Sequence, residues 1–196
     1  MKIIGLTGKK EVGKSTFAKF IQDHCTKNMK CIILPFSSIL KTMLLNAGIC
    51  TEKELYFDKN LYSREMMQKI GTDIIRDQID TNFFCKRMLD EIREIAKENP
   101  SFHEKLVIVI DDVRFQNEAK LIEDLGGILI RIVRPRSEEN IDPHRSETEM
   151  DQIKTVMPIF NDSDLDNLER AGADLSKFIP AFKNTTIARI AMVDFD

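Results

Sequence analysis

A stretch near the start of the sequence has the residue types and spacing of a phosphate-binding loop. Gly8, Gly13, Lys14 and Ser15 fill every fixed position of the pattern GxxxxGK followed by Ser or Thr. The glycines allow successive backbone N–H groups to converge on phosphate oxygens at the start of a helix. Lys14 is expected to reach the β- and γ-phosphates of ATP, and Ser15 to ligate Mg²⁺. The residues expected to contact ATP are Gly8, Lys9, Val12, Gly13, Lys14, Ser15 and Thr16.

Two carboxylates and an arginine follow the most apolar segment of the chain. Residues 106–110 read Leu-Val-Ile-Val-Ile, as in a central strand covered on both faces. Asp111 and Asp112 come next, where a strand-end carboxylate can hold Mg²⁺ or its waters, so either is a candidate metal ligand. Arg114 follows in a polar turn at the edge of the sheet where ligands bind, and is a candidate phosphate contact.

These groups need a parallel sheet to bring them together, and the pattern of apolar residues predicts one. Short apolar runs alternate with amphipathic segments, which is typical of βαβ units. Strands are expected over 2–7, 30–35, 106–111, 128–133 and 154–160, with a final strand over 187–193. Helices are expected after the loop, from Ser63, from Thr81 to Asn99, over 116–125 and from Ser163. The predicted fold class is α/β, a three-layer αβα arrangement with a central, mostly parallel five-stranded sheet.

Composition and charge narrow the possible partners. A formal net charge of −3 gives no basic field, so nucleic acid is not expected as a partner. No apolar run approaches the roughly 20 residues that span a bilayer, so no membrane partner is expected. The four cysteines are scattered and form no CxxC pair, which favours a reduced, cytoplasmic compartment. We expect one domain over 1–196, and the apolar face of Met66 and Ile70 leaves a homodimer open.

The least regular segment carries a concentration of charge. Residues 134–147 contain two prolines, which exclude a continuous helix, and loops of this length in a compact domain are often lids. We expect a lid over about 134–149. Its arginines Arg134, Arg136 and Arg145 are candidates to close over a reacting phosphate.

A phosphate-binding loop alone serves several classes of protein, and the rest of the sequence favours one. The chain has no Asn-Lys-x-Asp element of the kind that reads guanine in GTPases, and helicases and motors are generally larger. A short chain with scattered arginines and a candidate lid suits a kinase of a small phosphorylated substrate. Such a reaction needs positioning and charge neutralisation more than a nucleophilic side chain.

Four segments together carry a resemblance to a known family. They are the GLTGKKEVGKS start, RxxxQxxGTDxxR over 64–76, DVRFxNE over 112–118, and His144-Arg145-Ser146-Glu147. Their order and spacing resemble the deoxynucleoside monophosphate kinases of bacteriophages and other viruses, which are P-loop kinases. The match spans residues 5–147, and Asn161 after the last sheet strand also fits.

That resemblance implies transfer of the γ-phosphoryl group of ATP to a deoxynucleoside monophosphate in the cytoplasm, which for a virus is that of the host. It implies that Lys14, Arg114, Arg134 and Arg145 act on the transferring group, that Asn161 helps to bind ATP, and that Asp112 supports the metal. The region about 37–82 would bind the monophosphate. The implied substrate residues are Phe36, Lys41, Arg64, Gln68, Gly71, Thr72, Asp73, Arg76, Asp112, Arg114, His144 and Glu147.

One residue of the loop departs from the family pattern, and two other functions stay open. Glu11 stands where the family more often has a small residue, so its carboxylate must point away from the anion or be offset by Lys9 or Lys10. The alternatives are another P-loop small-molecule kinase, such as dephospho-coenzyme A kinase, or a non-catalytic ATP-binding regulator. The GTDxxR segment argues against the first. The retained lysine, serine, aspartates and arginines argue against the second.

Overall fold

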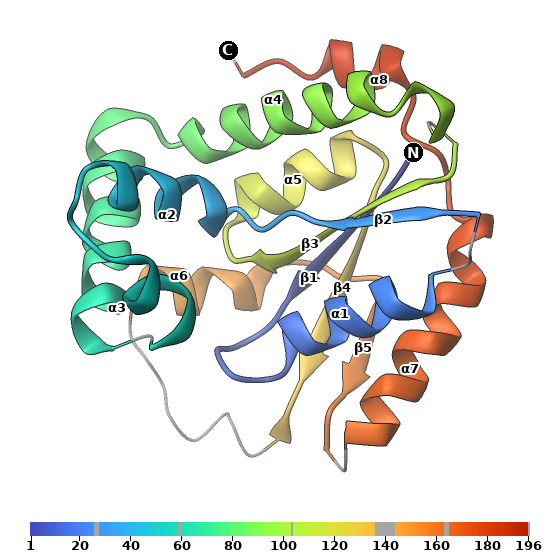
Figure 1. Cartoon of the computed structure of the whole chain (residues 1–196), viewed down its shortest axis with the longest axis horizontal. Coiled ribbons are helices and arrows are strands. Elements are labelled where there is room, and N and C mark those ends of the chain that lie inside the picture. The colour runs from blue at the N-terminus through green and yellow to red at the C-terminus, as the bar shows by residue number, and fades with distance from the viewer. Residues whose placement is uncertain (26–27, 59, 103, 136–143, 163–164, 196) are drawn as a thin grey trace.

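The computed structural model places a parallel sheet between two layers of helices (Figure 1). It describes residues 1–25, 28–58, 60–102, 104–135, 144–162 and 165–195. The strands are β1 (Lys2–Thr7), β2 (Lys30–Ile33), β3 (Leu106–Val113), β4 (Ile128–Val133) and β5 (Met157–Phe160). They lie in the order β2-β3-β1-β4-β5, and each neighbouring pair is parallel. The predicted α/β class and five-stranded sheet are confirmed.

The helices follow the strands in alternation. The α-helices are α1 (Lys14–His24), α2 (Ser37–Asn46), α3 (Leu61–Gln68), α4 (Phe83–Glu98), α5 (Gln116–Asp124), α6 (Arg145–Thr148), α7 (Leu165–Phe178) and α8 (Ile187–Met192). The described residues also include the π-helical segments η1 (Lys53–Phe57) and η2 (Lys69–Ile79), and the 3₁₀ turns η3 (Pro100–Phe102), η5 (Glu149–Gln152) and η6 (Ile179–Ala181). Within the described residues, no helix combines the length and the apolar character that crossing a membrane requires.

The two faces of β3 belong to two separate cores. Side chains alternate across a strand, so Ile108 and Ile110 face one layer and Val107 and Val109 face the other. The first pair packs into the cluster formed with α2, α4 and α5, and the second into the cluster formed with α1 and α7. All four are fully buried, which explains why this segment is apolar throughout.

The final predicted strand is wrong, because residues 187–192 form helix α8. The Thr186 side chain accepts a hydrogen bond from the Arg189 N–H, which caps the start of the helix. Ile190 is 3% exposed and belongs to the same apolar cluster as α4. An apolar run this short fits the period of a helix as well as that of a strand. As a helix it is buried against α4, whereas a strand beside β5 would lie at the exposed edge of the sheet.

Strands β1 and β4 have the predicted bounds, while one end of each of β2, β3 and β5 differs from prediction by two or three residues. β2 ends at Ile33, and Pro35, which has no N–H to donate, follows shortly after. β5 begins at Met157 rather than residue 154. β3 continues to Val113, so Asp111 and Asp112 lie inside the strand. The strand carries an extra residue there, since Gly5 and Thr7 of β1 pair with Ile110 and Val113 of β3.

The helical region between α2 and α4 contains a feature that the sequence does not indicate. Residues 69–79 form a π-helix, whose i→i+5 bonds widen each turn. A normal α-helical period would bury Ile70 and Ile74 together, yet Ile74 is 37% exposed. The wider turn instead buries Gly71, Thr72, Ile75 and Arg76.

Three helices start within a few residues of the predicted positions. Asn60, rather than Ser63, caps α3, because its side chain accepts from the Ser63 N–H. α4 begins at Phe83 after Asn82, while the Thr81 hydroxyl donates to the Arg76 carbonyl. Ser163 lies outside the described residues, and α7 begins at Leu165. The helix over 116–125 is confirmed as α5, which ends at a left-handed glycine, Gly126.

Helix α1 packs tightly against α7 at Gly172, which leads to a stability prediction. A Cβ built at Gly172 would lie 2.8 Å from Phe20 Cβ and 3.5 Å from the Ile21 nitrogen, atoms that cannot move without moving α1. Gly172→Val should therefore lower the free energy of unfolding in urea by about 2–3 kcal/mol through overpacking. Lys177→Val, on the exposed side of α7, is the control and should lower it by less than about 1 kcal/mol. Equal effects of the two substitutions would contradict this packing account.

Candidate active site

The loop between β1 and α1 has the backbone shape of a phosphate cradle. Gly8 and Gly13 have φ angles of +137° and +100°, a region that L-residues rarely adopt. A Cβ at Gly8 would lie 2.3 Å from the Ile132 carbonyl oxygen, and one at Gly13 would lie 2.7 Å from Asn161 Nδ2. Both glycines are therefore required by backbone angle and by space. Helix α1 begins at Lys14, so its N-terminus opens directly on the loop.

Lys14 is buried in the loop and held by its carbonyl groups. Its Nζ donates to the Gly8 and Lys9 carbonyl oxygens, each at 2.6 Å. Burial, and after it the nearby Arg114 guanidinium, lower the pKa of Lys14 to about 7, although the charges of Asp112 and Asp111 oppose the shift. An anionic phosphate in the cradle would stabilise the charged form of this lysine.

Asp111 and Asp112 are adjacent in the strand but contact different elements. Asp111 is buried and accepts a hydrogen bond from the Ser15 side chain. Its pKa is raised by burial and then by the charge of Asp112. Asp112 accepts the Phe36 and Ser37 N–H groups at 2.7 and 2.9 Å, at the start of α2. One aspartate therefore belongs to the phosphate loop and the other to α2.

The oxygen donors near the loop suit a hard divalent cation. Mg²⁺ is typically bound by one or two protein oxygens, substrate phosphates and water. The hydroxyl of Ser15 and the carboxylate of Asp111 are such a pair, and they lie close enough for the hydroxyl to favour the charged carboxylate. Among the described residues, no three His, Cys, Asp or Glu side chains gather into a metal cluster. The donor set therefore fits Mg²⁺ held jointly with a phosphate.

A pocket of about 460 Å³ opens beside the loop. It combines cationic and amide groups with leucine side chains, a mixture that suits a phosphate attached to a flat, largely apolar base. Asn161 is anchored there, since its Nδ2 donates to the Val12 carbonyl at 2.9 Å. The lining residues are Glu11, Gly13, Lys14, Ser15, Thr16, Arg134, Asn161, Leu165 and Leu168.

The two most selective sequence motifs meet at a buried carboxylate, Glu118. Its Oε2 accepts the Arg114 and Phe115 N–H groups at 2.7 and 3.1 Å, and its Oε1 accepts from Arg76 Nη2. The Arg76 guanidinium also lies 4.1 Å from the ring centre of Phe115 and 4.7 Å from that of Phe84. Burial raises the pKa of Glu118, and the Arg76 charge opposes that shift.

This arrangement encloses Arg76 within the fold. Arg76 is 5% exposed, and Gly71 and Thr72 are buried beside it in the π-helix. All three were expected to line the monophosphate site. Glu118 was not among the predicted site residues. Its position three residues after Phe115, in a polar helix start, was the available signal, since Glu at that position often accepts the capping N–H.

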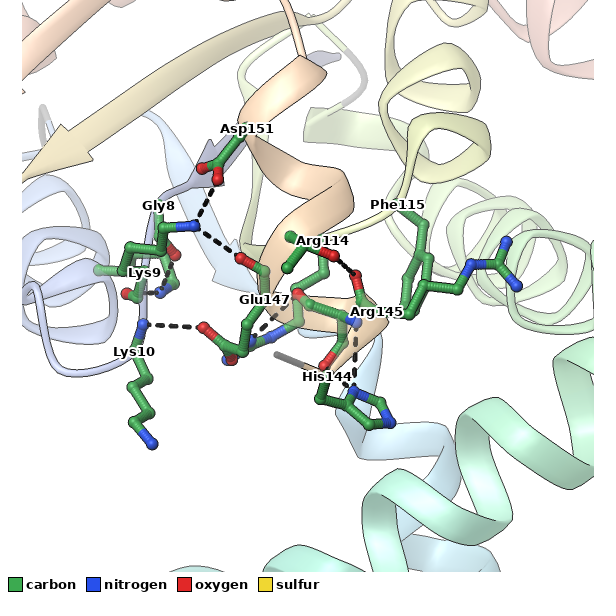
Figure 2. Close-up of polar contacts among 12 residues, drawn as sticks. Gly8, Lys9, Lys10, Arg114, Phe115, His144, Arg145, Glu147 and Asp151 are labelled. Carbon is green, nitrogen blue, oxygen red and sulfur yellow. Dashed lines mark hydrogen bonds and ion pairs between the residues drawn. The ribbon is translucent and has the colours of Figure 1, made fainter. Parts of the chain in front are cut away.

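Helix α6 joins the phosphate loop to Arg114 (Figure 2). The Glu147 carboxylate pairs with the Arg114 guanidinium and accepts the Lys10 N–H at 3.3 Å. Lys9 Nζ donates to the Glu147 carbonyl at 2.7 Å and to the Asp151 carboxylate at 2.5 Å. Lys9, Arg114 and Glu147 are thus brought together as a network around the loop. Asp151 carried no sequence signal.

Arg145 of α6 and the preceding His144 face the π-helix η2. Arg145 donates to Asp77 at 2.5 Å and to Glu149 at 2.9 Å, and Figure 2 shows it extending past Phe115, away from Lys9 and Lys10. His144 Nδ1 accepts the Ser146 N–H at 3.2 Å, and its Nε2 lies 3.8 Å from Asp73 Oδ1. Arg145 and His144 are therefore positioned to connect α6 with η2. Arg136 and the centre of the predicted lid lie outside the described residues.

The remaining predicted substrate residues lie on α2 and α3. Phe36 is buried at the start of α2, and Lys41 Nζ lies 4.4 Å from the ring centre of Tyr56. Gln68 is half-buried at the end of α3. Arg64, on the same helix, reaches the phosphate loop, because its Nη2 lies 3.4 Å from Glu11 Oε1. This ion pair is a direct contact between the loop and α3.

Comparison with known proteins identifies viral relatives. A model of the deoxynucleotide monophosphate kinase family matches residues 37–171. A protein of Acanthamoeba polyphaga mimivirus, whose name refers to a deoxynucleotide monophosphate kinase, is 35% identical over 169 residues, covering 79% of this chain and 85% of its own length. An uncharacterized protein of Ictalurid herpesvirus 1 is 32% identical over 119 residues, covering 60% of this chain and 48% of its own.

Two solved structures show a looser likeness. A sugar kinase from Janibacter sp. HTCC2649 is 9% identical, with a TM-score of 0.47 over 92% of this chain and 97% of that one. A gluconokinase from Sinorhizobium meliloti 1021 is 13% identical, with a TM-score of 0.45 over 92% and 94%.

The buried pair of Glu118 and Arg76 predicts a large loss of stability when its carboxylate is removed. Glu118→Gln should lower the free energy of unfolding by about 3–5 kcal/mol, because it leaves the Arg76 charge buried without a carboxylate. Denaturant titration followed by circular dichroism measures the change. Glu94→Gln breaks the exposed pair with Lys97 and should cost less than about 1 kcal/mol. A loss below about 1 kcal/mol for Glu118→Gln would show that the pair does not hold the two motifs together.

Proposed function

This chain belongs to the deoxynucleotide monophosphate kinase family, and on that premise we propose that it transfers the γ-phosphoryl group of ATP to a deoxynucleoside monophosphate. The products would be the deoxynucleoside diphosphate and ADP. The observation that carries the proposal is the contact between the loop residue Glu11 and Arg64 of α3, because it brings a candidate acceptor-binding helix against the candidate donor loop.

The donor half is proposed to be the phosphate loop with the pocket beside it. The loop N–H groups and Lys14 would neutralise the β- and γ-phosphates. Arg134 and Asn161 would contact the rest of the nucleotide, since both line the pocket. Ser15 and Asp111 would hold Mg²⁺, which when bound offsets the negative charge that shifts between the β- and γ-phosphates. Asp112 is proposed to position α2, because its carboxylate already binds two N–H groups there.

The acceptor half is proposed to lie between α2, α3 and η2. Arg64 would bind the acceptor phosphate, and Arg114, close enough to Lys14 to affect its pKa, would contact the phosphoryl group in transit. His144, Arg145 and Glu147 act in this proposal as positioning residues, because each is bound to neighbouring side chains or backbone. A lid over about 134–149 and a single domain over 1–196 stay predictions.

The proposed reaction needs no nucleophilic side chain. A phosphate oxygen of the acceptor forms a bond to the γ-phosphorus, and the bond from that phosphorus to the β-bridging oxygen breaks. The electron pair leaves with ADP, and the acceptor oxygen carries no proton at neutral pH. The residues therefore contribute alignment and positive charge rather than proton transfer.

Steady-state turnover tests the proposal directly. Release of ADP from ATP and Mg²⁺ should be stimulated by one or more deoxynucleoside monophosphates, in a panel that includes ribonucleoside monophosphates and dephospho-coenzyme A. Lys14→Ala should abolish turnover while the circular dichroism spectrum stays unchanged, because the lysine acts on phosphate charge. Lys19→Ala removes a lysine from the exposed side of α1 and should leave turnover intact. No stimulation by any monophosphate, or normal turnover in Lys14→Ala, would contradict the proposal.

The lowered pKa of Lys14 predicts a proton uptake on nucleotide binding. At pH 8 the free lysine is largely neutral, because its pKa is about 7. Bound phosphate favours its charged form, so binding of ATP and Mg²⁺ should take up nearly one proton at pH 8 and much less at pH 6. Titration calorimetry in buffers of different ionisation enthalpy measures this uptake, and Lys14→Met should remove it. Uptake that is the same in Lys14→Met would assign it to another group.

A further inference from the structure

Glu11 is held in a strained backbone conformation at the tip of the phosphate loop. Its φ is +62°, and it is the non-glycine residue with positive φ among the described residues. A left-handed conformation is unfavourable for a residue with a Cβ, and such strain concentrates at functional sites. Its side chain is 72% exposed, so no buried contact explains why a carboxylate stands at this position.

The Glu11 side chain is directed to Arg64 across the gap between the loop and α3. Glu11 Oε1 and Arg64 Nη2 are 3.4 Å apart, and the Arg64 side chain is 50% exposed. Glu11 also lines the pocket that contains Lys14 and Ser15. Glu11 therefore lines the loop pocket, and its carboxylate also contacts the arginine of α3.

A carboxylate and a phosphate bind a guanidinium through the same N–H groups. While Glu11 occupies Arg64, a phosphate can bind that arginine only after the carboxylate moves aside. Once it has moved, Glu11 remains close to the incoming anion and repels it. Both effects weaken binding of a phosphate at Arg64.

We infer that Glu11 is an internal competitor for the acceptor phosphate at Arg64, and that it sets the affinity for the monophosphate. This inference rests on the proposed function, since it needs a monophosphate to bind at α3. In this inference Glu11 sets affinity and acts through Arg64. It lowers the affinity of the site for phosphates and takes no part in the transfer step itself.

The test is the dissociation constant of each of the four deoxynucleoside monophosphates, measured by calorimetry without ATP. Glu11→Gln should tighten binding of the accepted monophosphate about 3- to 10-fold at low ionic strength, because it removes the competing charge. Glu11→Gly should tighten binding by a similar factor, which separates the loss of charge from the relief of backbone strain. Glu65→Gln is the matched control, since it removes the same charge from the exposed residue next to Arg64, and should change binding less than about 2-fold.

Combining Glu11→Gln with a substitution of Arg64 tests whether Arg64 is the site of competition. With Arg64→Gln, binding should be weaker, and adding Glu11→Gln should change it by less than about 2-fold. A full gain in that background, or no gain from Glu11→Gln in the otherwise normal chain, would overturn the inference and leave the proposed function standing. If no monophosphate binds to the normal chain or to Glu11→Gln, the proposed function and this inference fail together.

Discussion

A carboxylate buried among apolar side chains must find hydrogen-bond donors, and Glu118 finds them on two separate parts of the chain. It binds the backbone of Arg114 and Phe115 at the start of α5 and the guanidinium of Arg76 in the π-helix. Burying both charges is unfavourable unless they pair, so the two segments must lie together. The Arg76 guanidinium then contacts the rings of Phe84 and Phe115. The orientation of Arg114 and the position of η2 beside it thus depend on one ion pair. The rest of the candidate site is built on that junction.

The cations around the phosphate loop share a second property. Arg64 is paired with Glu11, Arg114 with Glu147, and Lys9 with Asp151. These three cations are therefore held by carboxylates before a substrate arrives, whereas Lys14 is held by backbone carbonyl groups. This arrangement orients the three cations without creating a large positive field, in keeping with a net charge of −3. A phosphate that binds at one of the three would replace a carboxylate there.

Local signals in the sequence predicted the parts of the structure that local chemistry decides. The two loop glycines, the start of α1 and the apolar strand β3 depend on backbone angles and burial that neighbouring residues reveal. The π-helix, the burial of Arg76 and the helix over 187–192 could not be predicted in this way, because each depends on what packs against it. The same holds for Asp111 and Asp112. Their sequence positions are equivalent, and only the extra residue in β3 and the neighbouring helices distinguish their roles.

The different contacts of Asp111 and Asp112 link two segments of the chain through the end of β3. The two residues are joined by one planar peptide bond, so their Cα atoms stay at a fixed separation although the dihedral angles on either side can rotate. Asp111 touches Ser15 in the phosphate loop, and Asp112 holds the first turn of α2. A displacement of this end of β3 would therefore move groups that contact both the phosphate loop and the start of α2. Through a single dipeptide, the strand end connects the two segments proposed for the two substrates.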